Sequence, residues 1–106
     1  MRLVNAIKSA EIVAAEDSRK FQRLCQDLKI ESKAKVISYF DGNETERLEK
    51  LVSELKSGVN LLLVTDAGMP TISDPGYLLV ESAVSNGIKV EVIPGPSAVT
   101  TALAIS

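Results

Sequence analysis

Apolar residues follow two different patterns along the chain, and the two patterns alternate. Short runs in which nearly every residue is apolar are typical of buried strands, and the clearest of them is Leu61 to Val64. Longer stretches carry apolar residues at the three-and-four spacing of a helix, as at Phe21, Leu24, Cys25 and Leu28. We expect strands at 12–15, 35–39, 60–65 and 89–93. We expect helices at 3–10, 18–28, 44–57, 75–86 and 97–106.

Several helix boundaries have capping signals. Asp17 or Ser18 can cap the second helix, and Asn43 forms a capping box with Glu46 three residues later. Gly58 ends the third helix. The fourth helix has Asp74 as its N-cap and Pro75 at its first position, and it ends at Asn86-Gly87.

The alternation of strands with helices of about ten residues is typical of βαβ units. The fold class is therefore α/β, with a mostly parallel sheet and helices on both faces. The chain begins within a helix and ends inside an apolar helix with no stop signal. We therefore expect 1–106 to be one domain of a longer protein.

The composition excludes several kinds of chemistry. The chain has no His and one Cys, so a Ser-His-Asp hydrolase and a thiolate metal cluster are not supported. A glycine-rich dinucleotide loop and a P-loop are also absent. Asp17, Asp66 and Asp74 are possible magnesium ligands, but Asp74 is better explained as a cap, and we expect no metal site. No apolar run is long enough to span a membrane and no signal peptide opens the chain, so we expect a cytoplasmic protein.

Charge is distributed unevenly. Residues 1–56 hold 11 of the 12 Lys and Arg and have a net charge of +1, whereas residues 57–106 have a net charge of −3. No cationic side chain occurs from Ser57 to Ile88. A phosphate bound there would depend on backbone N–H groups.

Candidate chemistry lies where strands end, because ligands of open parallel sheets bind at the carboxyl ends of the strands. Glu16 and Asp17 follow the first strand. They are either an acidic pair for proton transfer or hydroxyl binding, or a surface Glu beside a helix-capping Asp. The segment 65–76 is long for a strand-to-helix connection and contains two prolines and two glycines. It is either a ligand loop built from main chain or a rigid structural loop. The turn 94–98 opens the next helix with small residues that leave room for a ligand.

Other features have both a functional and a structural interpretation. Arg19, Lys20 and Arg23 form a basic helix face that either contacts RNA phosphates or is simply solvated. Tyr39 and Phe40 are either a base-stacking pair or half-buried strand residues. Cys25 lies on an apolar stripe and is expected in the core.

Four segments taken together resemble the tetrapyrrole-methylase-like superfamily, and within it the branch that 2′-O-methylates a cytidine of small-subunit ribosomal RNA. They are Ala-Ala-Glu-Asp-Ser-Arg (14–19), Ser-Tyr-Phe-Asp-Gly-Asn-Glu (38–44), Val-Thr-Asp-Ala-Gly-Met-Pro-Thr-Ile-Ser-Asp-Pro-Gly-Tyr (64–77) and Pro-Gly-Pro-Ser-Ala (94–98). The similarity covers essentially the whole chain, and the third segment is the most specific. The family's opening strand with its Pro-x-Gly-Asn turn is missing, as is its C-terminal domain. Members often have a His where 39–42 stand, so no His-based role applies here.

The resemblance implies an S-adenosylmethionine-dependent methyltransferase with two α/β domains, of which this chain is the N-terminal one, and commonly a homodimer. It implies that the cofactor is bound by Ala67, Gly68, Met69, Ile72, Ser97 and Ala98. It places Asp17, Arg19, Asn43 and Glu44 near the target ribose or the RNA. Because the chain has no His, Asp17 or Glu16 is the candidate base.

Two alternatives stay open at this point. One is a methylase of a small molecule such as a tetrapyrrole, and the other is a non-catalytic binding or dimerisation fragment. The acidic balance of the chain does not favour tight RNA binding by this fragment alone. Ribosomal RNA or the small ribosomal subunit is the expected partner, with positive charge supplied by another domain, a dimer or the assembled subunit.

Overall fold

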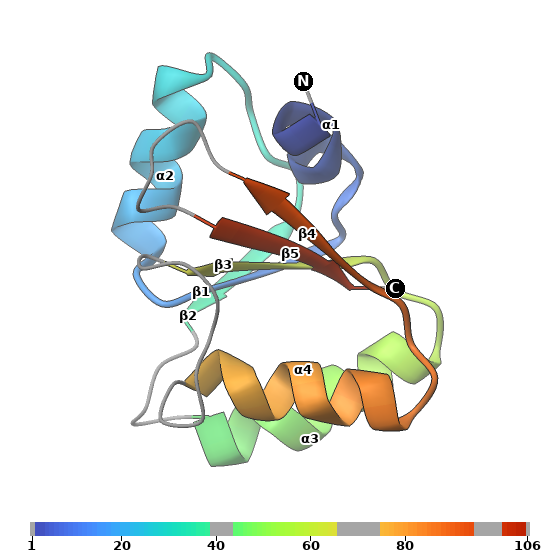
Figure 1. The fold of residues 1–106 in the computed structure, drawn as a ribbon. Coiled ribbons are helices and arrows are strands. Elements are labelled where there is room, and N and C mark those ends of the chain that lie inside the picture. Colours follow the sequence, from blue (N-terminus) through green and yellow to red (C-terminus); the bar gives the residue numbers. More distant parts are fainter. Residues whose placement is uncertain (1, 39–43, 66–74, 95–100, 106) are drawn as a thin grey trace.

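The computed structural model describes residues 2–38, 44–65, 75–94 and 101–105 (Figure 1). Helices and strands alternate through most of this part of the chain, as the apolar pattern predicts. In chain order the elements are α1 (Arg2–Ser9), β1 (Ile12–Ala15), α2 (Ser18–Asp27), β2 (Lys35–Ser38), α3 (Glu44–Lys56), β3 (Leu61–Thr65), α4 (Pro75–Ser85), β4 (Val90–Pro94) and β5 (Thr101–Ile105).

The described strands form one sheet in the order β2-β1-β3-β5-β4. β1 pairs in parallel with β2 and with β3, whereas β5 is antiparallel to both β3 and β4. Four strands therefore share one direction and β5 opposes them. The α/β prediction is confirmed, and "mostly parallel" holds for strand direction although two of the four pairings are antiparallel.

Helices cover both faces of the sheet, with α1 and α2 on one side and α3 and α4 on the other (Figure 1). Alternate strand residues supply the two cores, as the pleat requires. Val13 and Leu62 pack in the core beneath α1 and α2, while Ala14 and Leu63 pack in the core against α3 and α4. All five residues of β3 are buried, as expected of a central strand covered on both faces.

The expectation of a final helix at 97–106 is wrong for its described part, because 101–105 form β5. Periodicity cannot decide such a short run, in which Ala102 to Ile105 are all apolar. Placed between β3 and β4, the segment supplies hydrogen-bonding partners to both neighbouring strands. Leu103 and Ile105 become 0% and 1% exposed there. The pairing and the burial are both tertiary effects.

Three helices end with the same backbone motif. In α3 the Val59 N–H donates to the Glu54 carbonyl at 3.3 Å, and in α4 the Ile88 N–H donates to the Ala83 carbonyl at 2.9 Å. The residue before each donor is a glycine with positive φ, +97° at Gly58 and +73° at Gly87. These glycines confirm the predicted helix ends. In α2 the equivalent position is Lys29, with φ of 56°.

Candidate functional site

The carboxyl ends of β1, β2, β3 and β4 lie at one edge of the sheet, which we call the carboxyl edge. The register places Ala15, the last residue of β1, beside Ser38 and Val64. The chain leaving β1 stays in contact with β3, because the Glu16 N–H donates to the Val64 carbonyl at 3.3 Å. Thr65 and Pro94, which end β3 and β4, are both in register with Thr101. The edge therefore brings together the starts of all the predicted ligand segments.

Asp17, one of the two capping residues predicted from the sequence, is the N-cap of α2, and Ser18 begins the helix. Its backbone is extended, with φ of −133° and ψ of 106°, and its Oδ1 accepts a hydrogen bond from the Arg19 N–H at 3.0 Å. The Arg19 Nε lies 3.8 Å from the same oxygen. Because the Arg19 side chain is 90% exposed, this ion pair contributes little to stability. The capping interpretation of Asp17 is thus confirmed, and its catalytic role stays a prediction.

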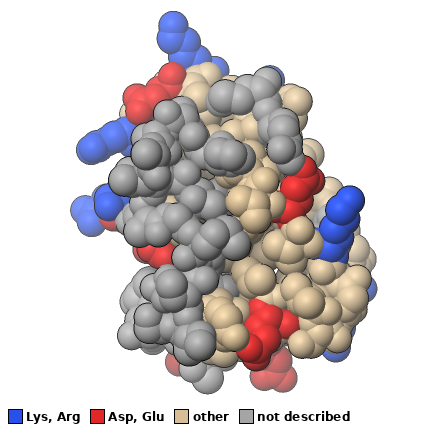
Figure 2. All heavy atoms as spheres, in the orientation of Figure 1, with Lys and Arg blue, Asp and Glu red and all other residues tan. Residues whose placement is uncertain are grey.

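The residues around Asp17 include both acidic and basic side chains. Glu16 is half-buried, and its N–H anchors the turn to β3. Arg19, Lys20 and Arg23 are exposed on α2, so the predicted basic face exists. Figure 2 shows basic side chains projecting from the outline at the upper left, where α2 lies in Figure 1. The structure therefore brings Glu16, Asp17 and Arg19 together in one turn at the carboxyl edge.

Most of the other predicted site residues lie outside the described part of the chain. These are the six cofactor residues together with Asn43 and the pair Tyr39-Phe40. Glu44 begins α3. The cofactor residues belong to 66–74 and 95–100, which directly follow β3 and β4 in the sequence. Their assignment stays a prediction.

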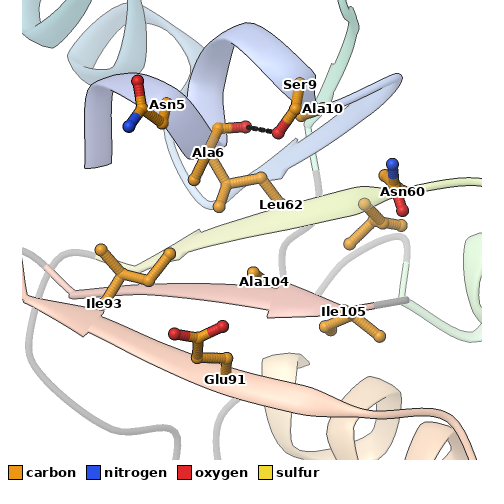
Figure 3. Close-up of a pocket in the computed structure, with 11 residues that line it drawn as sticks. Asn5, Ala6, Ser9, Ala10, Asn60, Leu62, Glu91, Ile93, Ala104 and Ile105 are labelled. Carbon is orange, nitrogen blue, oxygen red and sulfur yellow. Dashed lines mark hydrogen bonds between the residues drawn. The ribbon is translucent and has the colours of Figure 1, made fainter. Parts of the chain in front are cut away.

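A separate hollow of about 310 Å³ lies between α1 and the sheet (Figure 3). Small side chains line it, among them Ala6 and Ala104, with Asn5 and Asn60 near its rim. The Glu91 carboxylate reaches it from β4. Asn60 immediately precedes β3, so this hollow is at the opposite end of β3 from the carboxyl edge. Its lining also includes Ile93, one residue before the end of β4, so the hollow extends along the sheet toward the carboxyl edge.

Cys25 is 8% exposed and packs in the core beneath α1 and α2, as predicted. Burial raises the pKa of its thiol above the ordinary value. On α4, a side-chain hydrogen bond with Glu81 is the main cause that raises the pKa of Tyr77. Neither group is at the turn formed by Glu16, Asp17 and Arg19.

Neither a metal-binding cluster nor a membrane-spanning helix occurs among the described residues. No cluster of three or more Cys, Asp or Glu side chains there is arranged to hold a metal ion. None of the described helices combines the length and the apolar character needed to cross a membrane.

Two features were not predicted from the sequence: the burial of Thr65 at the carboxyl edge, and a hollow beside the outer strand β2. Thr65 is a polar residue that is only 2% exposed. Its place at the end of an otherwise apolar strand is the sequence feature that could have indicated a buried polar group. The second feature is a hollow of about 70 Å³ between β2 and α3 with Lys35, Arg47 and Lys50 in its lining. The sequence gives little indication of this hollow, because its cations come from one residue of β2 and two residues of α3 that lie far from it in the sequence.

Comparison with known proteins gives consistent matches over the whole chain. The model of a family described as Tetrapyrrole (Corrin/Porphyrin) Methylases matches residues 1–106. A protein named "Ribosomal RNA small subunit methyltransferase I" from Mycobacterium tuberculosis (strain CDC 1551 / Oshkosh) is 47% identical over 99% of this chain and 37% of its own length. Proteins of the same name from Thermotoga maritima and Halalkalibacterium halodurans are 39% and 43% identical, over 47% and 36% of their lengths. The chain thus spans less than half the length of these relatives.

Proposed function

Because this chain belongs to the tetrapyrrole (corrin/porphyrin) methylase family, we propose that it is the N-terminal α/β domain of an S-adenosylmethionine-dependent methyltransferase. We propose further that the enzyme 2′-O-methylates a cytidine ribose in small-subunit ribosomal RNA. The observation that carries this proposal is the set of relatives with 39–47% identity over nearly the whole chain, whose shared name specifies ribosomal RNA.

The charge of the chain suits the proposed methyl donor. When bound, S-adenosylmethionine supplies a methyl group activated by a positively charged sulfonium. The stretch from Ser57 to Ile88, which includes β3 and the segment after it, contains no Lys or Arg. A sulfonium bound beside β3 would therefore meet no cationic side chain from this stretch, which avoids like-charge repulsion. We propose that Ala67, Gly68, Met69, Ile72, Ser97 and Ala98 bind the donor.

The turn after β1 provides the groups for the acceptor ribose. A 2′-hydroxyl must lose its proton when it attacks the methyl group, and a carboxylate within hydrogen-bond reach can take that proton. We assign this role to Asp17 or Glu16, with Arg19, Asn43 and Glu44 positioning the RNA. The described contacts of the Asp17 side chain both use Oδ1. A carboxylate has a second oxygen, and this leaves Asp17 with capacity to accept the hydroxyl proton.

The first experiment is a titration of S-adenosylmethionine into this chain, followed by backbone amide NMR. We expect shifts confined to residues 65–73 and 95–99, with adenosine triphosphate as a control that should produce none of them. If the spectrum of the folded chain does not change, either the donor site needs the second domain or the donor assignment is wrong. The same titration on the full-length protein separates the two, because a wrong assignment predicts no shifts in residues 65–73 and 95–99 there either.

The role of the turn is tested by methyl transfer to small-subunit ribosomal RNA with the full-length enzyme, because we expect this domain alone to be inactive. If Asp17 accepts the proton, Asp17→Asn should lower the rate on the order of 10²-fold or more while leaving donor binding unchanged. Asn still caps a helix, so this variant separates the chemistry from the fold. Glu16→Gln is the matched variant for the other candidate base. An unchanged rate in both variants would eliminate both carboxylates as the base.

The description of the matching family favours a second candidate substrate, a tetrapyrrole or a similar small molecule. The relatives' shared name favours RNA over this alternative. Transfer of labelled methyl groups to a tetrapyrrole but not to ribosomal RNA would reverse that choice. A homodimer and a cytoplasmic location stay predictions.

A further inference from the structure

We propose that the hollow between β2 and α3 binds a phosphate of the RNA backbone, next to the nucleotide presented at the carboxyl edge. We call it the basic hollow; its cationic lining consists of Lys35, Arg47 and Lys50. The identity of the ligand rests on the proposed function, because that function supplies an RNA substrate.

The basic hollow forms where one face of α3 packs against one face of β2. Arg47, Lys50, Leu51 and Glu54 recur at the three-and-four spacing, so they lie on one face of α3. In β2, Lys35 and Ile37 point to the same side of the sheet, and Ile37 packs in the core against α3 and α4. The apolar residues Ile12, Ile37 and Leu51 complete the lining. The cations therefore stand around an apolar floor at the outer strand of the sheet.

The charges in the basic hollow favour an anion. Three cations and one carboxylate, Glu54, line it, which leaves a local charge of +2. Within the described part of the chain, no ion pair or side-chain hydrogen bond engages Lys35, Arg47 or Lys50. Like charges held close together repel one another, and a phosphate would relieve that repulsion. Lys35 and Lys50 are exposed and Arg47 is half-buried, so the cations are accessible to a large ligand.

The position of the basic hollow connects it with the candidate site. Lys35 begins β2, and Ser38 ends it at the carboxyl edge beside Ala15. Three residue steps of a strand cover about 10 Å. A nucleic acid with its ribose at the carboxyl edge can therefore place a neighbouring phosphate near Lys35. A chain of phosphates fits this open, surface position better than a free phosphate ion does, because affinity then accumulates over several contacts.

The test measures binding of a fluorescently labelled single-stranded RNA to the full-length enzyme by anisotropy at several salt concentrations. The site variant is Lys35→Gln, Arg47→Gln and Lys50→Gln combined. The matched control removes the same charge from exposed lysines that do not line the hollow, at Lys8, Lys56 and Lys89. A charge-preserving variant, with Lys35→Arg, Arg47→Lys and Lys50→Arg, tests whether charge at this place is sufficient.

We expect the site variant to bind RNA on the order of tenfold more weakly, and its salt slope to fall by about 0.7, since one phosphate contact on a single strand contributes about 0.7. The control variant should bind within about twofold of wild type if position rather than net charge matters. The charge-preserving variant should bind like wild type. Equal losses in the site and control variants, or no RNA binding by the full-length wild-type enzyme at low salt, would overturn the proposal.

Two further measurements identify which proposal fails. Inorganic phosphate that competes with the RNA at low concentration would show a free-phosphate site instead of an RNA contact. Donor binding by NMR is measured on the same site variant, and it should be unchanged because the donor residues follow β3 and β4. If RNA binding by the full-length enzyme depends on the basic hollow but the enzyme transfers no methyl group to RNA, the proposed function is contradicted and this inference is left intact.

Discussion

The cap of α2 gives the sharpest test of the structure, because the same residue is also the candidate base. In Asp17→Ala the Arg19 N–H loses its acceptor at 3.0 Å, and the first turn of α2 is left with an unsatisfied donor. Loss of such a cap costs about 1 kcal/mol. The ion pair with Arg19 adds little to this cost, because one partner is 90% exposed.

A loss of about 1 kcal/mol corresponds to a fall in Tm of roughly 4 °C for a domain of this size. The assay is urea unfolding followed by far-UV circular dichroism, supported by a thermal scan. Asp17→Asn keeps a side-chain oxygen at the N-cap and should differ from wild type by no more than a few tenths of a kcal/mol. Arg19→Gln removes the ion pair alone and should be equally mild.

Two results would refute this reasoning. If Asp17→Ala were as stable as wild type, the hydrogen bond to the Arg19 N–H would have no net value. If Asp17→Asn were as unstable as Asp17→Ala, the negative charge at the helix N-terminus would be the stabilising feature, through the helix dipole.

Four further predictions address the core, the helix ends, the thiol and the last strand. Leu63→Ala should lower the free energy of unfolding by about 2–5 kcal/mol, because Leu63 is 0% exposed in the central strand; denaturant titration measures this, and a loss well under 1 kcal/mol would contradict the assigned packing. Lys29→Gly should raise stability by about 1 kcal/mol, because φ of 56° is strained for a side chain, and a destabilised variant in the same titration would oppose that explanation. Burial raises the pKa of the Cys25 thiol above its ordinary value of 9.0, so the stability contributed by the neutral buried thiol is fully present below pH 9.0 and is lost as the pH rises through the folded-state pKa. Between pH 8 and 11, Cys25→Ala should therefore lose less of its free energy of unfolding than wild type does. Identical pH profiles for the two proteins would argue against this explanation. Cross-strand NOEs between Leu63 and Leu103 should demonstrate the β3–β5 pairing, whereas strong sequential amide–amide NOEs over 101–105 would indicate a helix instead.

The candidate site was only partly predictable. The Asp17 cap follows from a residue type and its place before a helical stripe, both of which are local. The convergence of β1, β2 and β3 at one edge follows from the parallel pairing that alternating elements imply. The basic hollow could not be predicted, because Lys35 joins Arg47 and Lys50 only when α3 packs across β2.

The sequence by itself determined what depends on neighbours within a few residues. The helical stripe of α2, the buried run of β3, and the glycine ends of α3 and α4 all belong to this class, because backbone sterics and side-chain periodicity act locally. The tertiary structure alone decided the order of the strands and the state of 101–105. Those five residues are apolar enough for a helix or a strand, and the position between β3 and β4, where both neighbours offer backbone partners, selected the strand.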